Sequence, residues 1–501
     1  MIARMEPLPQ HLYRAEQVRE LDRIAIEEFG IPGRVLMQRA GEAAFACLRG
    51  RWPAARRIGV LCGGGNNGGD GFVVARCARE AGLAVTVWLL ADAGRLSGDA
   101  RLAYEALIAA GVTPRSFAAE GGESDEVAAC DVLVDALLGT GLDREVTGRW
   151  RQAITAMNAA DAPVLALDVP SGLHADRGVV QGCAVRAQAT VTFIGLKQGL
   201  FTAQGPDHCG RLHYDSLQVP DGILARLPPA AVRLDYRAMR RLLPPRRQAS
   251  HKGDYGHVLV VGGAPGMSGA PRLAAEAAAR CGAGLVSVAT APGHASVLNL
   301  TRPELMVHGV AGAPDLRPLL ERATVVAVGP GLGRTSWARG LLDAVLESGL
   351  PLVADADALN LLALEPASRE DWVLTPHPGE AARLLGETRT AAVQSDRFAA
   401  VQALQARYGG VIVLKGNGSL VCESGHPLAL CDAGNPGMAT AGVGDVLTGV
   451  IAALIAQGVS AGDAARLGVC LHACAGDRAA QAGMRGLLAG DLLPHLQSLL
   501  H

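Results

Sequence analysis

The stretch 61–72, which reads LCGGGNNGGDGF, decides how the first half of the chain folds. Gly63, Gly65 and Gly68 have the spacing G-x-G-x-x-G, which lets a backbone turn tightly after a strand and approach a pyrophosphate at a helix N-terminus. An apolar run, 58–62, precedes the loop, and the helical pattern FVVARCAREAG follows it. We therefore predict a strand, an anion-binding loop and a helix. Because the chain holds 63 glycines, the spacing alone does not identify a dinucleotide site.

The polar residues of the same loop indicate a second kind of ligand. Asn66 and Asn67 bring two carboxamides, and Asp70 a carboxylate, to a turn that would face a pyrophosphate. Carboxamide and carboxylate oxygens coordinate hard cations. The alternative is structural: the two asparagines would supply turn conformations, and Asp70 would cap the helix.

Two further strand ends in the first half carry polar residues. An amphipathic pattern at 15–29 predicts a helix, and runs nearly continuous in Val, Ile and Leu predict strands at 84–90, 131–139, 163–172 and 189–195. Asp135 lies in one strand end, and Asp168 and Ser171 lie in another. We predict a doubly wound α/β sheet whose loops bring Asn67, Asp135 and Ser171 together as oxygen ligands of one cation. Asp168 would be free to move protons beside it.

Composition and charge exclude several classes of protein. The 501 residues suggest two or three domains, and 46 basic against 48 acidic residues give a net charge of −2, so no basic field for nucleic acid is present. The N-terminal segment lacks an apolar signal region, and no later apolar run reaches about 18 residues. The 11 cysteines include no C-x-x-C pair, which indicates neither a disulfide framework nor a zinc site. We expect a cytoplasmic protein with no nucleic-acid or membrane partner; a homo-oligomer is compatible with the sequence.

The α/β pattern lapses between Asp221 and Lys252 and then restarts. This segment contains two Pro-Pro pairs and clustered arginines, which we interpret as a solvated linker in preference to a nucleic-acid patch. We place the domain boundary here and assign 1–225 and 226–501 to two domains. The second half begins with HVLVVGGAPGMSGAPRLAAEAAARCGAGLVSVAT, and TVVAVGPGLG, PLVADADALN, WVLTPHPGE and GVIVLKGNGS each read as a strand ending in a polar or glycine-rich loop. In parallel α/β folds such strand ends hold the ligands.

Lysine is nearly absent from the chain. Only Lys197, Lys252 and Lys415 occur among the 46 basic residues, and all three lie in glycine-bearing segments. A compact ammonium on a flexible stem can have a role that a guanidinium fork cannot fill. Coincidence in a glycine-rich chain is the alternative.

Two loops of the second half predict phosphate chemistry. The turn GVGD, 442–445, stands directly before an apolar helix, where free backbone amides favour an anion. Asp445 would accept a proton from a hydroxyl that attacks a phosphoryl group; the alternative is a helix N-cap. The loop KGNGS, 415–419, adds a lysine and glycine amides suited to phosphates; the alternative is a hairpin turn with a solvated lysine.

In its first half the sequence resembles the bifunctional NAD(P)H-hydrate repair enzymes, in which an NAD(P)HX epimerase is fused to an NAD(P)HX dehydratase. The motifs NNGGDG, VDALLGTG, DVPSG and GLKQGL occur in this order, and the likeness covers nearly the whole chain. The resemblance implies that Asn67, Asp135 and Ser171 hold a potassium ion. It also implies that the hydrated nucleotide contacts Asn66, Asn67, Gly68, Gly69, Asp70, Gly139, Thr140, Gly141, Leu142, Asp143, Arg144, Glu145 and Asp168.

The second half resembles the ribokinase-like fold and, within it, the ADP-dependent NAD(P)HX dehydratase. The motifs are SGAPRLAAEAAARCGAGLV, GPGLG, DADALN, TPHPGE, KGNGS and GVGD. The resemblance implies substrate contacts at Ala270, Gly331, His377 and Asp445, and adenine-nucleotide contacts at Lys415, Gly416, Asn417, Gly418, Ser419 and Gly444. Without it, His377 between two prolines reads as a solvated loop residue. Pro271 departs from the small aliphatic residue expected there.

The resemblance implies one repair sequence carried by two α/β domains, an N-terminal Rossmann-like sheet and a C-terminal ribokinase-like domain. The first would interconvert the R and S epimers of NAD(P)HX, with Asp168 catalytic. The second would dehydrate the S form by phosphoryl transfer from ADP, with Asp445 catalytic, giving NAD(P)H, AMP and phosphate; magnesium is expected with the phosphates. The alternatives are a small-molecule kinase of hydroxymethylpyrimidine or hydroxyethylthiazole type fused to a nucleotide-binding domain, and a dinucleotide sensor without turnover.

Overall fold

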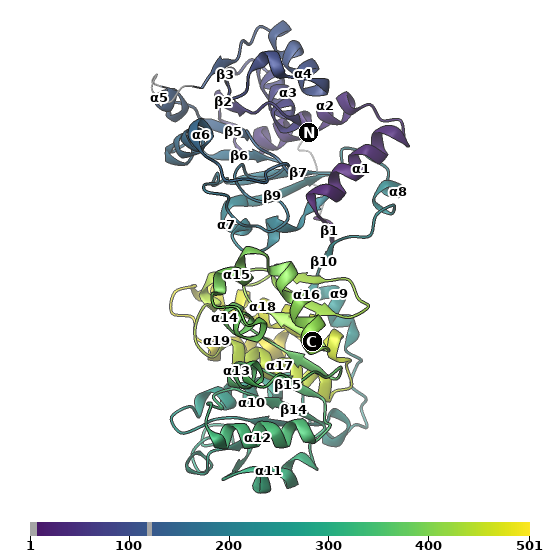
Figure 1. Ribbon diagram of the computed structural model, residues 1–501, viewed down its shortest axis with the longest axis vertical. Coiled ribbons are helices and arrows are strands. Elements are labelled where there is room, and N and C mark those ends of the chain that lie inside the picture. The colour runs from purple at the N-terminus through teal and green to yellow at the C-terminus, as the bar shows by residue number, and fades with distance from the viewer. Residues whose placement is uncertain (1–7, 118–122, 501) are drawn as a thin grey trace. The chain divides into compact units, whose positions relative to one another are not determined.

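The computed structural model describes residues 8–117 and 123–500, and it divides into two compact units (Figure 1). The first unit extends to Val232, and the second begins at Arg233. No helix within the described ranges combines the length and apolar character needed to cross a bilayer.

The first unit is built on a parallel sheet of seven strands in the order β4-β3-β2-β5-β6-β7-β9 (Figure 1). The strands are β2 Arg57–Cys62, β3 Ala84–Leu89, β4 Arg115–Ser116, β5 Val132–Ala136, β6 Val164–Leu167, β7 Ala189–Phe193 and β9 Arg211–Asp215. The order reverses between β2 and β5, and such a switch point opens a crevice at the carboxyl ends of the strands. This arrangement confirms the predicted Rossmann-like sheet.

Helices cover both faces of this sheet because its strands are apolar on both sides. Val60 and Val134 pack into one core cluster with α2 and α3, while Leu61 and Leu133 pack into another with α6. The helices are α1 Ala15–Glu27, α2 Gly33–Arg51, α3 Asn66–Glu80, α4 Gly98–Ala109, α5 Glu123–Ala128, α6 Gly148–Ala159, α7 Gly205–Cys209 and α8 Asp221–Leu224. Three short strands, β1 His11–Tyr13, β8 Leu196–Lys197 and β10 Ala231–Arg233, lie outside this seven-stranded sheet.

The second unit contains strands in the order β13-β12-β11-β14-β15-β16-β17-β18-β19, parallel as far as β17 and antiparallel beyond it. Their bounds are β11 His257–Val261, β12 Leu285–Thr290, β13 Met306–Gly309, β14 Val325–Val328, β15 Leu352–Ala354, β16 Trp372–Leu374, β17 Val411–Leu414, β18 Ser419–Glu423 and β19 Ala429–Cys431. The strands predicted for this half are present, which confirms a second α/β domain.

The helices of the second unit include one, α17, that is apolar on nearly every side. The α-helices of this unit are α9 Tyr236–Met239, α10 Gly269–Arg280, α11 Ala313–Leu320, α12 Ser336–Glu347, α13 Ala356–Leu364, α14 Pro378–Leu385, α15 Thr390–Ser395, α16 Arg397–Tyr408, α17 Val443–Ala456, α18 Ala461–Ala479 and α19 Ala489–Leu499. Helix α17 packs against α10 so closely that a Cβ added at Gly449 would lie 1.9 Å from the carbonyl oxygen of Ala274. Only glycine fits this crossing.

We expect Gly449→Ala to lower the free energy of unfolding of the second unit by about 1–3 kcal/mol, because the added methyl group forces the two helices apart. Gly340→Ala is the matched control: Gly340 also lies within a helix, α12, but an added Cβ meets no atom within 4 Å. It should raise the stability by about 0.5–1 kcal/mol through helix propensity. Thermal melting of both variants checks this, and equal shifts of the same sign would contradict it.

Candidate active sites

The first site begins with a buried carboxylate at the end of β5. Asp135 is fully buried, and its Oδ2 accepts the backbone N–H of Ser171 at 2.7 Å. The Ser171 hydroxyl donates to Asp135 Oδ1 at 2.5 Å. Burial raises the pKa of Asp135 to about 6, although the hydrogen bonds from Ser171 and from the N–H of Leu137 oppose this effect. A cation beside this carboxylate would favour its charged form.

Asn67, in the first turn of α3, completes the group. Its Nδ2 donates to the carbonyl oxygen of Leu138 at 3.1 Å, and the Ser171 hydroxyl lies 3.1 Å from the same oxygen. The Asn67 Oδ1 is buried without a hydrogen-bond partner among the described residues. The loops thus bring Asn67, Asp135 and Ser171 together, and an orphaned amide oxygen beside a buried carboxylate forms a donor set that fits a hard monovalent or divalent cation.

Asp168 lies at the end of β6 with a left-handed backbone, φ +63°. Its carboxylate forms an ion pair with the ammonium of Lys197, which is 1% exposed. The Thr192 hydroxyl at 3.2 Å and the Phe193 N–H at 3.3 Å also donate to it. The sequence marked Lys197 by the rarity of lysine but gave it no role, because only the fold brings β8 to the end of β6.

Two more carboxyl groups face the Lys197 ammonium. Asp70 is 9% exposed, and burial raises its pKa well above the usual range, with Asp168 and Asp22 adding to the effect. Burial likewise raises the pKa of Asp22, on α1, to about 6. The helix-cap alternative for Asp70 is wrong, because the N-cap of α3 is Gly65 and Asp70 lies in the second turn.

The remaining predicted substrate residues of this unit lie in two segments, 66–70 and 139–145, that meet where Gly139 contacts Asn67. Gly139 packs on Asn67, since a Cβ added to it would lie 3.3 Å from the Asn67 Cβ. Gly68 must be glycine, because an added Cβ would lie 2.1 Å from the carbonyl oxygen of Gly63. Gly68 and Gly69 are buried, Thr140 and Leu142 are half-buried, and Asn66, Gly141, Asp143, Arg144 and Glu145 are exposed. Glu145 forms an ion pair with Arg151 at 3.1 Å.

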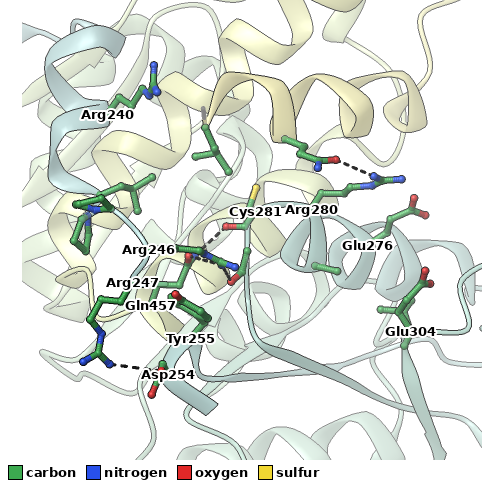
Figure 2. Close-up of a pocket in the computed structure, with 18 of the residues that line it drawn as sticks. Arg240, Arg246, Arg247, Asp254, Tyr255, Glu276, Arg280, Cys281, Glu304 and Gln457 are labelled. Atoms are coloured by element: carbon green, nitrogen blue, oxygen red, sulfur yellow. Dashed lines mark hydrogen bonds and ion pairs between the residues drawn. The ribbon is translucent and has the colours of Figure 1, made fainter. Parts of the chain in front are cut away.

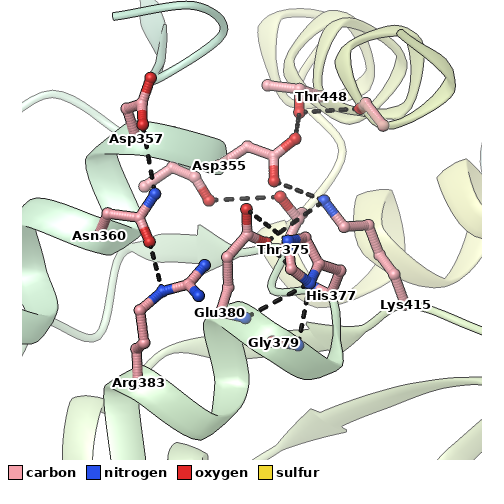
Figure 3. Close-up of polar contacts among 12 residues, drawn as sticks. Asp355, Asp357, Asn360, Thr375, His377, Gly379, Glu380, Arg383, Lys415 and Thr448 are labelled. Carbon is pink, nitrogen blue, oxygen red and sulfur yellow. Dashed lines mark hydrogen bonds and ion pairs between the residues drawn. The ribbon is translucent and has the colours of Figure 1, made fainter. Parts of the chain in front are cut away.

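The second site has a buried ion pair at the carboxyl ends of β15 and β17 (Figure 3). The Lys415 Nζ lies 2.6 Å from Asp355 Oδ1, and the Thr448 hydroxyl, from α17, donates to Asp355 Oδ2 at 2.8 Å. Burial opposes the ionisation of Asp355, but the Lys415 ammonium and the Thr448 hydroxyl outweigh it and hold its pKa below the usual range. Glu380 lies 3.9 Å from the same ammonium, and burial raises its pKa to about 7.

Asp445 lies beside this pair. Burial raises its pKa to about 7, and the negative charge of Asp355 adds to the effect. Its carboxylate accepts no hydrogen bond from the part of the chain that the structure describes. The N-cap of α17 is Gly442, with φ +88°, so the helix-cap alternative for Asp445 is wrong. A Cβ added at Gly444 would lie 3.3 Å from Lys415 Nζ, which places the GVGD turn over the pair.

The loop Lys415–Ser419 joins β17 to the antiparallel β18, so its backbone is a hairpin, but its lysine is only 18% exposed and pairs with Asp355. Gly416 has φ +136° and Gly418 φ +68°, which other residues rarely adopt. Arg397 fixes the loop: it is 1% exposed and donates to the carbonyl oxygens of Leu414 at 3.3 Å and Gly418 at 3.2 Å. No role was predicted for Arg397, Asp355 or Glu380, although Asp355 and Glu380 lie in the motifs DADALN and TPHPGE.

The other predicted substrate residues of the second unit, His377, Ala270 and Gly331, each have a defined place in the fold. His377 is the N-cap of α14: its Nδ1 accepts the N–H of Gly379 at 2.9 Å, and half of its side chain is exposed. Ala270 and Gly331 adjoin, since a Cβ added at Gly331 would lie 3.2 Å from the Ala270 Cβ. Pro271 lies in the first turn of α10, where a backbone N–H has no intrahelical partner.

A cavity of about 1140 Å³ lies elsewhere in the second unit, and no predicted site residue lines it (Figure 2). Arginines of the predicted linker border it. The Arg246 guanidinium lies 3.7 Å from the centre of the Tyr255 ring and donates to Gln457 Oε1 at 3.2 Å, while Arg247 pairs with Asp254 at 3.6 Å. These arginines have partners within the unit, although both side chains remain exposed to solvent.

Comparison with known proteins covers both units. The family described as "NAD(P)H-hydrate dehydratase" matches residues 258–498, and the family described as "YjeF-related protein N-terminus" matches residues 33–199. Among solved structures, a hypothetical protein from Streptococcus mutans is similar at 29% identity and a TM-score of 0.50, covering 54% of this chain and 99% of its own.

Curated relatives match along nearly the full length. The bifunctional NAD(P)H-hydrate repair enzyme Nnr of Coxiella burnetii is 52% identical over 98% of this chain and 99% of its own. The enzyme of the same name from Escherichia coli K12 is 44% identical over 99% of this chain and 95% of its own. The chain therefore belongs to the family of bifunctional NAD(P)H-hydrate repair enzymes.

Proposed function

We propose that this chain repairs NADH and NADPH that have been hydrated at C6 of the reduced nicotinamide ring. The first unit interconverts the R and S epimers of NAD(P)HX, and the second dehydrates the S epimer at the expense of ADP. The observation that carries the proposal is the similarity to bifunctional repair enzymes over 98% of the chain, which spans both units and both clusters of buried charge.

In the first unit, the loops Asn66–Asp70 and Gly139–Glu145 would hold the hydrated nucleotide. Asn67, Asp135 and Ser171 would hold K⁺, for which the orphaned Asn67 oxygen and the buried Asp135 carboxylate are the support. The ion would supply a fixed positive charge next to the substrate loops. Inversion at C6 requires this carbon to become trigonal, so a proton must move at its hydroxyl oxygen, and Asp168 is the proposed acceptor and donor.

In the second unit, Asp445 would take the proton of the C6 hydroxyl as the hydroxyl oxygen forms a bond to the terminal phosphorus of ADP. AMP leaves with the electrons of the broken P–O bond. Cleavage of the C6–O bond then releases phosphate, and loss of the C5 proton leaves the ring double bond. The hydrated nucleotide would contact Ala270, Gly331 and His377, and the loop Lys415–Ser419 with Gly444 would bind the adenine nucleotide.

Magnesium would accompany the nucleotide phosphates and neutralise the charge that develops during transfer. Glu380 fits as a protein ligand of the magnesium ion. The Glu380 carboxylate is 6% exposed, and burial raises its pKa to about 7. A cation beside the carboxylate would lower this pKa again. The Lys415 ammonium, 3.9 Å away, would face the same phosphates.

We also propose that the predicted halves, 1–225 and 226–501, are separate catalysts, and the test uses fragments divided after Val232. The assay mixture contains both epimers of hydrated NADH together with ADP. Fragment 233–501 should restore the absorbance of reduced nicotinamide only to the extent of the S epimer, and adding fragment 1–232 should restore the remainder. A stable phosphorylated product would support a kinase, and binding without turnover a sensor. Replacing ADP by ATP in the same assay identifies the phosphoryl donor.

Epimerisation should require K⁺, and Na⁺ should replace it poorly. Asp135→Asn keeps the size of the side chain but removes the buried charge, so we expect the K⁺ concentration for half-maximal rate to rise by about tenfold or more. Epimerisation rates in K⁺, in Na⁺ and without either ion measure this. Dehydration of the S epimer by the same preparation controls for intact protein, and identical ion dependence in wild type and variant would refute the site.

Dehydration should depend on ionised Asp445. Because its pKa is about 7, the wild-type rate should fall as the pH is lowered through 7, where the carboxyl group becomes protonated and cannot accept a proton. Asp445→Asn should lower the rate by about 10²-fold and abolish this pH dependence, with epimerisation and nucleotide binding retained.

Asp463→Asn is the matched control for Asp445→Asn. Asp463 occupies the third position of α18 as Asp445 does of α17, but its side chain is 42% exposed. Asp463→Asn removes the same negative charge near a helix N-terminus and should leave the rate of dehydration unchanged. Near wild-type dehydration by Asp445→Asn would remove the proposed base.

A further inference from the structure

The carboxylate of Asp168 is held by one oxygen only. The Lys197 ammonium, the Thr192 hydroxyl and the Phe193 N–H all donate to Oδ1. Within residues 8–117 and 123–500, no donor contacts Oδ2. A carboxylate can accept hydrogen bonds at both oxygens, so this distribution leaves Oδ2 with its full capacity.

The backbone also fixes the direction of this carboxylate. Asp168 adopts φ +63°, an unfavourable region for a residue with a side chain, and its N–H donates to the carbonyl oxygen of Val191 at 2.7 Å. A strained residue persists where its surroundings determine its conformation, and such residues cluster at functional sites. Here β6 and β7 hold the backbone while Lys197 and Thr192 hold the side chain.

Lys197 cannot contact a substrate directly, because it is 1% exposed. Besides Asp168, its ammonium donates to the Thr192 hydroxyl at 3.2 Å and to the carbonyl oxygen of Phe193 at 3.0 Å. The other charged groups that face it are Asp22 from α1 and Asp70 from α3, whose burial favours their neutral forms. Of these three carboxyl groups, Asp168 is the one to which the Lys197 ammonium donates a hydrogen bond.

We propose that Lys197 is a positioning residue for epimerisation: it holds Asp168 through Oδ1 so that Oδ2 exchanges a proton with the C6 hydroxyl. This inference rests on the proposed epimerase function. The hydroxyl proton passes to Oδ2, C6=O forms, and the electron pair of the C6–N1 bond moves to N1. Closure on the opposite face reverses these steps, and Oδ2 returns the proton, so no further reactant is needed.

The test compares the pH profiles of epimerisation for five full-length proteins. Lys197→Met removes the charge and keeps most of the side-chain volume. Thr192→Val removes one donor to Oδ1, and Thr190→Val is its matched control, since Thr190 lies two residues earlier on β7, is equally buried, and donates instead to the carbonyl oxygen of Cys209 at 2.7 Å. Lys197→Arg and the wild type complete the set.

We expect Lys197→Met to lower kcat by about 10²-fold near neutral pH with KM little changed, and to move the acidic limb of the profile to higher pH, because a carboxylate without its cation is harder to ionise. Thr192→Val should lower kcat by about three- to tenfold with a smaller displacement of the limb, while Thr190→Val keeps the wild-type profile. Lys197→Arg, which retains the charge, should keep the limb near its wild-type position.

Other results would overturn the inference. A kcat for Lys197→Met within twofold of wild type would do so, as would a uniform loss at every pH with the limb unmoved, or equal effects of Thr192→Val and Thr190→Val. Dehydration of S-NADHX by the second unit shows whether each variant is intact; if Lys197→Met does not fold, Thr192→Val and Lys197→Arg decide. Wild-type protein that dehydrates the S epimer but never converts the R epimer would refute the proposed epimerase function itself.

Discussion

A lysine ammonium buried against an aspartate carboxylate is the constraint on which both clusters depend. Lys197 pairs with Asp168 in the first unit, and Lys415 pairs with Asp355 at 2.6 Å in the second. Removing one partner of a buried pair leaves an uncompensated charge, which costs about 3–5 kcal/mol. The partners are far apart in the chain, Lys197 on β8 with Asp168 after β6, and Lys415 after β17 with Asp355 after β15, so each pair forms only through tertiary folding. A compact ammonium suits these positions better than the wider guanidinium fork, which gives a physical reason for two of the three lysines in a chain otherwise rich in arginine.

The carboxyl groups around Lys415 differ in the pKa that their surroundings give them. The Lys415 ammonium and the Thr448 hydroxyl keep Asp355 ionised, while burial raises the pKa values of Asp445 and Glu380 to about 7. A proton acceptor that titrates near neutral pH thus stands beside a carboxylate that does not. Surroundings that give neighbouring carboxyl groups different pKa values are typical of acid–base sites.

The sequence predicted those features that depend on local pattern. Continuous apolar runs located the strands, and polar residues at their ends located Asn67, Asp135 and Ser171, because parallel strands bring their carboxyl ends to one edge. Arg397 and Thr448 were not predicted, since they reach the second site from helices α16 and α17 through tertiary packing, with no signal in their own segments. The helix-cap alternatives failed for a local reason: glycine caps both helices, which places Asp70 and Asp445 inside them.

Each proposed site draws its residues from one unit. The residues around Asp168 all belong to the part of the chain before Arg233, and those around Asp445 all belong to the part after Val232. The proposed base, Asp445, has a fixed position, so it would serve one epimer at C6 and leave the other unrepaired. Epimerisation removes that limit without any shared side chain, since the product of one site is the substrate of the other. Fusion of the units therefore ensures that both activities are made in equal amounts, and the chemistry of neither site requires the other to be near.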